Sequence, residues 1–315
     1  MKIVITGIAG AIGSHLGERL LESGHKVVGI DSFTSFYNPA IKKINAEDVI
    51  KKGGEIYEYD LAEDDIAEVL KDVEVIFHLA AQPGISPKTK FEEYTKNNIL
   101  ATQRLLEAAI KIPTLKLFVY VSTSSVYGMR AQGNEKTITE PTSYYGVTKL
   151  AAEQLALSYY RELGLPVTVL RMFSVYGPRE RPEKLFYKLI KSILEKKDFS
   201  LFQGSEYHKR SFTYVGDAIE ACVSAINNLE KTIGEIFNIG GGVVATTGEG
   251  IKIVEEILNQ KATIVTLPKR PGDQFETRAD ISKAIEVLGF RPTTSLRQGL
   301  EKQVMWYKDK IHNKI

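Results

Sequence analysis

A tyrosine and a lysine four residues apart are the most chemically suggestive pair in the sequence. Tyr145 and Lys149 lie in a segment of helical pattern, where residues i and i+4 project from one face and can share a site. A nearby ammonium group lowers the pKa of a phenol from its reference of about 10, which turns Tyr145 into a usable proton acceptor. The alternative for an isolated Tyr-x-x-x-Lys pair is a surface contact, so the surrounding sequence has to decide between the two.

A hydroxyl-rich turn supplies that context. Ser122, Thr123, Ser124 and Ser125 follow a strongly apolar strand pattern, at the edge where parallel sheets bind their ligands. Their hydroxyl groups are suited to bridge a substrate alcohol to Tyr145. The alternative is capping of the strand end, which we expect for at least one of them.

Three glycines between the first strand and the first helix predict a dinucleotide site. Gly7, Gly10 and Gly13, together with Ala11 and Ile12, form a βα turn in which absent side chains let the backbone approach a pyrophosphate at a helix N-terminus. The spacing is GxxGxxG, not the commoner GxGxxG, and the alternative is a tight structural turn.

An aspartate at the end of the second strand favours NAD as that dinucleotide. Asp31 is placed to accept both hydroxyl groups of an adenosine ribose and to repel a 2′-phosphate, and the next basic residue is Lys42. The alternative for Asp31 is a solvated loop acid. The ends of the third and fourth strands are expected beside the adenine and the pyrophosphate, with strand-end packing as the alternative; their residues are Asp60, Leu61, Leu79, Ala80 and Ala81.

The elements that position these residues follow an alternating strand and helix pattern. Continuous apolar runs predict strands buried on both faces of a parallel sheet, and the segments between them are long enough for right-handed crossovers. The predicted strands are 2–6, 26–30, 55–59, 73–79, 116–122, 166–173 and 235–239, and the predicted helices are 12–21, 91–110, 145–163, 183–196, 248–258, 281–288 and 296–308. The fold class is therefore a doubly wound α/β sheet with a smaller C-terminal lobe.

The chain is expected to divide into two lobes. Residues 1–172 form the dinucleotide-binding part, to which residues 212–242 return, and residues 173–211 and 243–315 form the substrate-binding part. The boundary is placed after Arg171 because the regular alternation of strands and helices becomes weaker there, and Gly177-Pro178 and Arg181-Pro182 interrupt it.

Composition excludes several classes of protein. The 315 residues are 43% hydrophobic and 25% charged, with a net charge of +2, which argues against disorder and gives no field for nucleic acid. The single Cys222 cannot form an internal disulfide, which suggests the cytoplasm. No run is long and apolar enough for a membrane span, and the five histidines show no metal-binding spacing.

At this level the chain resembles the extended short-chain dehydrogenases/reductases, specifically the NAD-dependent nucleotide-sugar epimerases and dehydratases. The motifs that carry the resemblance occur in the family's order along almost the whole chain: Thr6-Gly7-x-x-Gly10-x-x-Gly13, His78-Leu79-Ala80-Ala81, the serine-rich turn before Val126-Tyr127-Gly128, Tyr145-x-x-x-Lys149, and Arg171 with Tyr176-Gly177-Pro178. Ile8 and Ala11 depart from the glycine and phenylalanine usual in the turn.

The resemblance implies roles for single residues. Thr123 takes the catalytic Ser/Thr position, Tyr145 is the base, and Lys149 is its partner and a ligand of the nicotinamide ribose. Asn98 takes the position of an asparagine that orders the cofactor site. The substrate's nucleotide diphosphate is expected at Arg210, Arg270 and Asp273. The family also implies a homodimer through helices 91–110 and 145–163, whose apolar faces have the sheet's core as their alternative.

Within the family, the chain resembles the UDP-glucuronate 4-epimerases most. Dehydratases carry an Asp-Glu pair after the catalytic Thr, and UDP-glucuronate decarboxylases a glutamate at the position of Ser125. The resemblance places the sugar carboxylate at Arg181, with Ser124, Ser125 and Ser174 as hydroxyl donors. For Arg179, a substrate contact and a solvated loop charge stand as equal alternatives. UDP-glucose 4-epimerase is the alternative activity, and a non-catalytic NAD sensor is less favoured.

A uronate substrate explains why a firm grip on the carboxylate is needed. Removal of the 4-hydroxyl proton by Tyr145 and of a hydride from C4 gives a 4-keto sugar, which turns and is reduced on its other face. With a carboxylate at C6 this intermediate is a β-keto acid, which loses carbon dioxide readily. A charge-assisted grip keeps the breaking bond out of alignment with the ketone.

Overall fold

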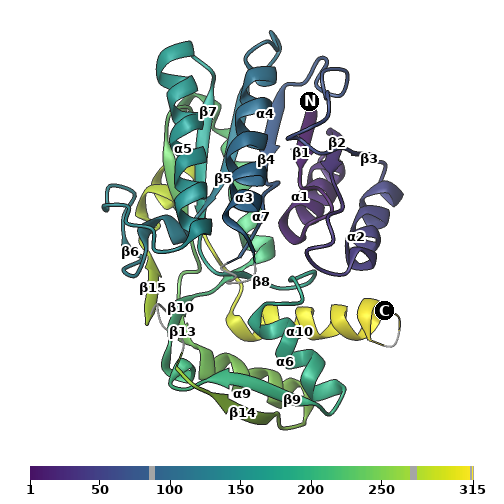
Figure 1. Ribbon diagram of the computed structural model, residues 1–315, viewed down its shortest axis with the longest axis vertical. Coiled ribbons are helices and arrows are strands. Elements are labelled where there is room, and N and C mark those ends of the chain that lie inside the picture. The colour runs from purple at the N-terminus through teal and green to yellow at the C-terminus, as the bar shows by residue number, and fades with distance from the viewer. Residues whose placement is uncertain (85–88, 270–274, 313, 315) are drawn as a thin grey trace.

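A seven-stranded parallel sheet forms the centre of the computed structural model, which describes residues 1–84, 89–269, 275–312 and 314 (Figure 1). The strands run in the order β12-β7-β5-β4-β1-β2-β3. Their bounds are β1 Lys2–Thr6, β2 Lys26–Asp31, β3 Glu55–Glu58, β4 Val75–His78, β5 Leu117–Thr123, β7 Val167–Met172 and β12 Ile236–Ile239. The predicted doubly wound parallel sheet is confirmed.

The central strands are buried on both faces, which explains their continuous apolar runs in the sequence. Every residue of β4, β5 and β7 is buried, as expected of strands covered on both faces. From β1 the sheet is extended in one direction by β2 and β3 and in the opposite direction by β4, β5, β7 and β12. The direction of strand order therefore reverses between β1 and β4. Doubly wound folds bind ligands at the carboxyl ends of the strands beside such a reversal.

Helices cover both faces of the sheet. α1 (Ala11–Glu22), α2 (Pro39–Lys51) and α7 (Val215–Asn227) contribute to one apolar core. The other core involves α4 (Ala101–Ala109) and α5 (Tyr144–Leu163), with α3 (Phe91–Tyr94) and the π-helical η1 (Thr95–Leu100) leading into α4. The helix predicted over 91–110 is therefore a continuous run whose middle turn is π-helical.

Helix α2 was missed by the sequence prediction. Its apolar residues do not follow a clear stripe, yet its start carries a recognisable signal: the Asn38 side chain accepts a hydrogen bond from the Ala40 N–H, and Pro39 occupies the first turn. This helix matters because it brings Lys42 and Asp48 to the two places discussed below.

Part of the chain after β7 packs below the sheet in Figure 1 around a core of its own. This core includes α6 (Leu185–Leu194), α9 (Thr247–Leu258), α10 (Leu296–Trp306), the π-helical η5 (Tyr307–Ile311) and β9 (Asp198–Phe202), which pairs with β14 (Thr263–Leu267). A four-stranded sheet joins β13 (Val244–Thr246), β10 (Lys209–Ser211), β15 (Glu276–Ala279) and β6 (Gln132–Gly133), and a small pair joins β8 (Val175–Tyr176) and β11 (Thr213–Tyr214). The short helical turns are η2 (Ser124–Tyr127), η3 (Ser205–Tyr207), α8 (Leu229–Thr232) and η4 (Ala284–Leu288).

Two predicted helices end differently from expectation. The helix predicted over 183–196 is α6, which begins only at Leu185 because a turn precedes it, closed by a hydrogen bond of 3.0 Å from the Lys184 N–H to the Arg181 carbonyl oxygen. The helix predicted over 281–288 is largely a π-helical turn from Ala284 to Leu288. Among the helices of the described residues, none has the length and apolarity to cross a bilayer.

Candidate active site

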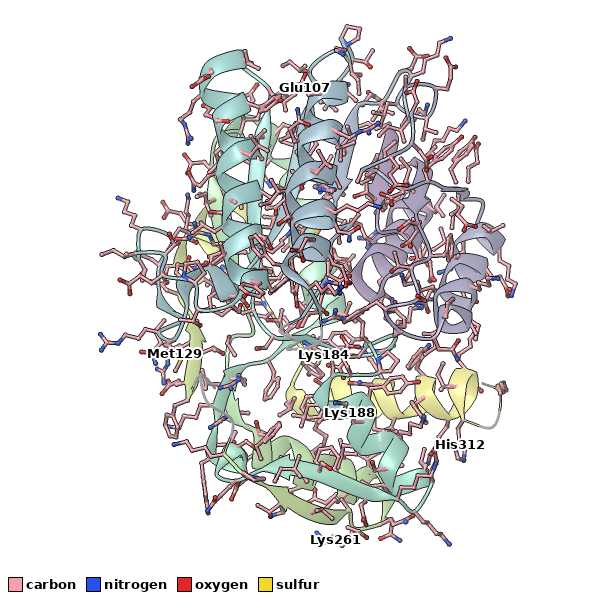
Figure 2. All side chains as sticks on the ribbon, viewed as in Figure 1. Glu107, Met129, Lys184, Lys188, Lys261 and His312 are labelled. Atoms are coloured by element: carbon pink, nitrogen blue, oxygen red, sulfur yellow. The ribbon has the colours of Figure 1, made fainter. Side chains whose placement is uncertain are left out.

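A cavity of about 630 Å³ opens at the carboxyl ends of the parallel strands. It lies between the sheet and the C-terminal elements, where Figure 2 shows Lys184. The structure brings together at its walls the following residues predicted from sequence: Gly7, Gly10, Ala11, Ile12, Gly13, Asp31, Asp60, Leu61, Leu79, Ala80, Ala81, Thr123, Ser124, Ser125, Tyr145, Lys149, Ser174, Arg181 and Arg210. Arg270 and Asp273 lie outside the described residues.

The glycine turn has the close backbone packing that a dinucleotide cradle needs. Gly7 adopts a φ of +72°, and a Cβ atom on Gly13 would lie 2.2 Å from the Gly7 carbonyl oxygen. A Cβ on Gly7 would lie 2.8 Å from the backbone nitrogen of Ala80. Only glycine therefore allows the turn to pack this closely against α1 and the chain after β4, and the N-terminus of a helix offers N–H groups to an anion. The turn fits the pyrophosphate of NAD.

Asp31 is held at the edge of the same cavity. Its two carboxylate oxygens accept hydrogen bonds from the Ala9 N–H at 3.1 Å and the Phe33 N–H at 2.9 Å, which leaves lone pairs for ribose hydroxyl groups. Lys42 Nζ lies 3.8 Å from Asp31 Oδ1 and also lines the cavity. The tertiary structure therefore corrects the argument from charge repulsion, because Asp31 is paired with a cation. That Asp31 accepts the ribose hydroxyl groups stays a prediction.

Helix α5, which carries Tyr145 and Lys149, begins directly beside the hydroxyl-rich turn. The Ser143 side chain caps its first turn by accepting from the Gly146 N–H at 3.1 Å. Lys149 Nζ donates to the Val121 carbonyl oxygen at 2.8 Å and lies 4.2 Å from the centre of the Tyr120 ring. Burial lowers the pKa of Lys149 to about 7, although Glu153 opposes this shift.

Tyr145 carries a half-buried phenol whose ionisation depends on its neighbours. Burial raises its pKa above the ordinary value of 10.0, and the charge of Arg181 and a hydrogen bond with Thr123 oppose this rise. The sequence pointed to Lys149 as the cation that lowers the pKa of Tyr145, and that assignment stays a prediction. The structure adds Arg181 as a second cation with this effect.

Thr123 combines a structural and a site-facing position. Its Oγ1 accepts a hydrogen bond from the Ser125 N–H at 3.1 Å and thereby caps the short helix η2. Its hydroxyl group also donates to Ser125 Oγ at 3.3 Å. The Ser122 hydroxyl group donates to Glu153 Oε2 at 2.6 Å. This first hydroxyl of the turn therefore forms a buried hydrogen bond between β5 and α5. The expectation that at least one hydroxyl group serves as a cap is confirmed.

Arg181 reaches the cavity from the loop after β8. Its Nη1 lies 3.1 Å from Glu183 Oε1, and both side chains line the cavity. Ser174 lies on the same wall with a φ of +35°, an unusual backbone for a residue with a side chain. Lys184 adds another cationic group, whose pKa is lowered by burial.

Asn98 stands behind the cavity wall instead of lining it. It is 1% exposed, and its amide accepts from the Gln82 N–H at 2.7 Å and donates to Thr148 Oγ1 at 2.9 Å. These bonds join the segment after β4 to α5. Asn98 thus orders a part of the wall, and direct contact with the cofactor stays a prediction.

Several cavity residues were not found from the sequence. Tyr37, Lys42, Gln82, Glu183 and Lys184 belong to this group. Lys42 and Tyr37 come from α2 and the loop before it, which the prediction left unassigned. Glu183 is adjacent to the Arg181-Pro182 break, and that position was the only signal for it.

Comparisons with known proteins agree with this geometry. The model of the NAD dependent epimerase/dehydratase family matches residues 3–240. Uncharacterized UDP-glucose epimerase YtcB of Bacillus subtilis is 41% identical, with 97% of this chain and 98% of that protein covered. UDP-glucuronate 4-epimerase 6 of Arabidopsis thaliana is 34% identical, with 98% of this chain and 71% of that protein covered.

A solved structure is similar over nearly the whole length. The crystal structure of UDP-glucuronic acid 4-epimerase from Bacillus cereus, in complex with UDP-glucuronic acid and NAD, is 40% identical with a TM-score of 0.94, and 98% of this chain and 99% of that chain are covered. The family match over most of the chain and these relatives lead to one conclusion. This chain belongs to the NAD dependent epimerase/dehydratase family.

Proposed function

We propose that this protein is an NAD-dependent 4-epimerase that interconverts UDP-glucuronate and UDP-galacturonate. The observation that carries the proposal is a cation beside the phenol: Arg181 lines the same cavity as Tyr145 and is close enough to lower its pKa. A hexuronate bound with its 4-hydroxyl group at Tyr145 has its carboxylate only two carbons away. A guanidinium at that distance is the group best suited to hold it.

Each catalytic residue has a defined task in this proposal. Tyr145 accepts the proton of the 4-hydroxyl group, while Thr123, which is hydrogen-bonded to it, aligns the alcohol. NAD, when bound, accepts the hydride from C4 and returns it to the opposite face. Lys149 is oriented by its hydrogen bond to the Val121 carbonyl oxygen and is the proposed ligand of the nicotinamide ribose.

The substrate is held at its two ends. Arg181 takes the carboxylate with the hydroxyl groups of Ser124, Ser125 and Ser174, which line the same cavity. Arg210, also on the cavity wall, takes the nucleotide diphosphate. Arg270 and Asp273, outside the described residues, remain the proposed partners of Arg210 at that end.

UDP-glucose 4-epimerase is the second candidate, and one observation favours it. Arg181 already has a carboxylate partner in Glu183 at 3.1 Å. Because the two charges offset each other, this part of the cavity is also suited to a sugar that carries no carboxylate. A carboxylate-bearing substrate must displace Glu183 or share Arg181 with it. The two activities therefore differ in what happens to this one ion pair.

The test is to assay the purified protein with UDP-glucuronate and UDP-glucose at equal concentrations and to identify the products. We expect the higher kcat/KM with UDP-glucuronate and formation of UDP-galacturonate. Tyr145→Phe should lower kcat by at least about 10²-fold, the usual effect of losing a general base, with UDP binding nearly unchanged. Tyr144→Phe is the matched control, because this neighbouring tyrosine is 59% exposed. A higher kcat/KM with UDP-glucose would contradict the proposal.

We also propose how the protein is organised and where it works. The two lobes are residues 1–172 with 212–242, which hold NAD, and residues 173–211 with 243–315, which hold the nucleotide sugar. A homodimer is supported by exposed apolar residues on α3, η1 and α5, namely Phe91, Leu100 and Val147. The proposed location is the cytoplasm, consistent with a single cysteine that is buried. Size-exclusion chromatography with light scattering tests the dimer.

A further inference from the structure

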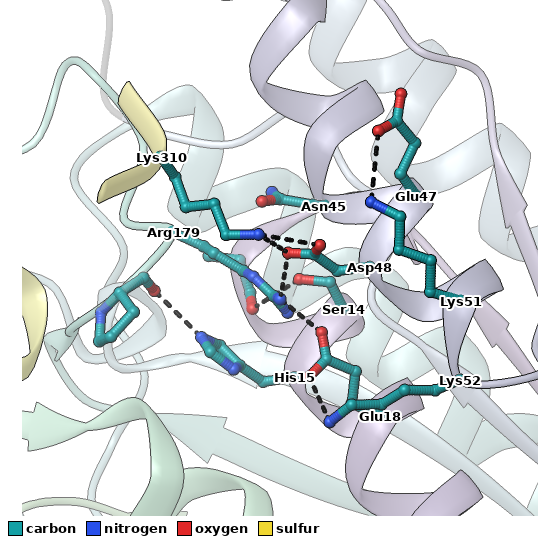
Figure 3. A network of polar contacts seen from close by, with 12 residues as sticks. Ser14, His15, Glu18, Asn45, Glu47, Asp48, Lys51, Lys52, Arg179 and Lys310 are labelled. Carbon is teal, nitrogen blue, oxygen red and sulfur yellow. Dashed lines mark hydrogen bonds and ion pairs between the residues drawn. The ribbon is translucent and has the colours of Figure 1, made fainter. Parts of the chain in front are cut away.

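Arg179 lies two residues before Arg181 and is buried in a network of charges (Figure 3). The Arg179 side chain is only 7% exposed. Its Nη2 contacts Glu18 Oε1 on α1 and Asp48 Oδ2 on α2, the latter at 3.0 Å. Arg179 does not line the cavity, so neither alternative from the sequence holds: it is not a solvated loop charge, and it is not placed to touch the substrate.

The network extends to the C-terminal end of the chain. Asp48 Oδ1 lies 3.1 Å from Lys310 Nζ on η5, and Glu18 Oε2 lies 2.9 Å from Lys52 Nζ. Burial raises the pKa of Glu18 and of Asp48, but their cationic partners outweigh this effect and leave both values below the ordinary ones. Both carboxylates are therefore charged at neutral pH and attract Arg179.

The backbone at Arg179 needs this support. Its φ is +65°, a left-handed conformation that costs a residue with a side chain energy and persists only where the surroundings enforce it. The preceding Pro178 carbonyl oxygen accepts a hydrogen bond from His15 Nε2 on α1 at 3.2 Å. Two bonds to α1 and one to α2 thus fix the loop against the helices that flank the glycine turn.

The next residue fixes the loop on its other side. Glu180 is 5% exposed, and its Oε2 accepts from the Tyr187 N–H at 3.1 Å and from Gln303 Nε2 on α10 at 2.8 Å. Arg181 then points into the cavity. Arg179 therefore contacts α1 and α2, Glu180 contacts α6 and α10, and Arg181 lines the cavity.

We infer that Arg179, Glu18 and Asp48 form an ionic clamp that sets the position of Arg181 relative to the cofactor-binding turn. In this role Arg179 is a positioning residue for the C6 carboxylate. The inference rests on the proposed function, because its consequence depends on a uronate substrate. α1 begins at the glycine turn, so the contact between Arg179 and Glu18 links the loop that carries Arg181 to the helix that begins at the proposed cofactor site.

Loosening the clamp should change the product more than it changes binding. If Arg181 moves, the carboxylate of the 4-keto intermediate is free to align with the ketone. The C5–C6 bond then breaks, its electron pair forms an enolate with the C4 carbonyl group, carbon dioxide leaves, and a solvent proton adds to C5. The product is a UDP-4-ketopentose, and the hydride removed from C4 is left on the cofactor.

The experiment compares clamp variants with a variant on the same helix. Arg179→Met and Asp48→Asn weaken the clamp, and Arg179→Lys restores one cationic nitrogen. Because Nη2 is the only Arg179 nitrogen with a hydrogen-bond partner among the described residues, a lysine should recover most of the attraction. Glu47→Gln is the matched control, since Glu47 lies on α2 in an exposed pair with Lys51 at 3.9 Å.

The measurements are the ratio of decarboxylated to epimerised product, the absorbance of reduced cofactor, UDP affinity and the melting temperature. We expect Arg179→Met and Asp48→Asn to raise the decarboxylated share about tenfold, equivalent to about 1.4 kcal/mol of lost discrimination. UDP affinity should stay within about twofold of the parent. Arg179→Lys should lie near the parent, and Glu47→Gln should equal it.

Two results would overturn the clamp. An unchanged product ratio in folded Asp48→Asn, whatever its melting temperature, would reduce these contacts to a structural role. Equal losses in Arg179→Met and Arg179→Lys would show that charge is not what holds Arg181. If the parent protein itself does not convert UDP-glucuronate, that result contradicts the proposed function, and with it the expected effect of the clamp on the product ratio.

Discussion

Glu153 and Arg171 form a buried ion pair beneath the active-site end of α5. Arg171 Nη2 lies 2.5 Å from Glu153 Oε1, and its Nε donates to Oε2 at 3.1 Å. Ser122 donates to the same carboxylate at 2.6 Å, and the two charged side chains are at most 3% exposed. One carboxylate thus joins α5, β5 and β7 just below the cavity.

We predict that Glu153→Gln lowers the free energy of unfolding by about 3–5 kcal/mol, because it leaves the charge of Arg171 buried without an anionic partner. Urea denaturation measures the change. Glu162→Gln, at an exposed position of the same helix, should leave stability within about 0.5 kcal/mol of the parent. A loss below about 1 kcal/mol in Glu153→Gln would mean that the pair contributes little.

Arg181→Ala should separate the two candidate substrates. Removing the guanidinium takes away the partner of the C6 carboxylate, so selectivity for UDP-glucuronate over UDP-glucose should fall by about 2–5 kcal/mol, the scale for a sequestered charge pair. The share of pentose product should rise. The ratio of kcat/KM values for the two sugars gives the result, with Arg130→Ala at an exposed position as the control. Parental selectivity without pentose would remove Arg181 from the substrate site.

Glu183→Gln should act in the opposite direction. Loss of the carboxylate at 3.1 Å leaves Arg181 available, so selectivity for UDP-glucuronate should rise about twofold to fivefold, as expected for a partly exposed ion pair. The same kinetic ratio measures it. In an Arg181→Ala background the substitution should have no further effect on selectivity, and an effect that survives there would show that Glu183 acts by another route.

Cofactor preference should depend on the pairing of Asp31 with Lys42. Asp31→Ser removes the acceptor for the ribose hydroxyl groups and leaves the Lys42 charge unpaired at the cavity edge, which suits a 2′-phosphate. We expect NAD affinity to fall and NADP affinity to rise, measured by calorimetry. Adding Lys42→Met should cancel the gain for NADP. If Asp31→Ser binds both cofactors as the parent does, Asp31 is not the ribose ligand.

His78, which is fully buried, and His15, which is half-buried, should make stability depend on pH. Burial lowers the pKa of His15 to about 4 and that of His78 to about 3, from an ordinary 6.5. Between these values the unfolded chain binds more protons than the folded one, so the free energy of unfolding falls as the pH drops below 6.5. The slope should be about 1.4 kcal/mol per pH unit for each histidine.

Urea denaturation between pH 6.5 and about pH 5 measures this slope, before most carboxyl groups titrate. His15→Gln keeps an N–H donor for the Pro178 carbonyl oxygen and removes one of the two titrations, so the slope should be about halved. A flat stability profile in the parent over this range would contradict the assignment of His15 and His78 as neutral in the folded protein.

Much of the fold and of the site could be predicted from local sequence. The strands of the parallel sheet were visible because burial on both faces demands continuous apolar runs, as in β5 and β7. Gly7, Gly13, Tyr145 and Lys149 were recognisable because their chemistry depends on short spacings along one turn or one helix face. Helix α2 escaped because its residues show no regular apolar stripe.

Only the tertiary structure decided the partners of charged residues far apart in the chain. Lys42 beside Asp31, Glu153 beside Arg171, and Arg179 between Glu18 and Asp48 are contacts between different elements, and a guanidinium at a loop position looks the same in the sequence whether it is solvated or buried. The sequence determined which residues share the glycine turn and that Tyr145 and Lys149 share one helix face, since those relations are local. Packing alone determined that Arg181 lines the cavity while Arg179 is buried against Glu18 and Asp48, because ion pairs form through space and carry no sequence spacing.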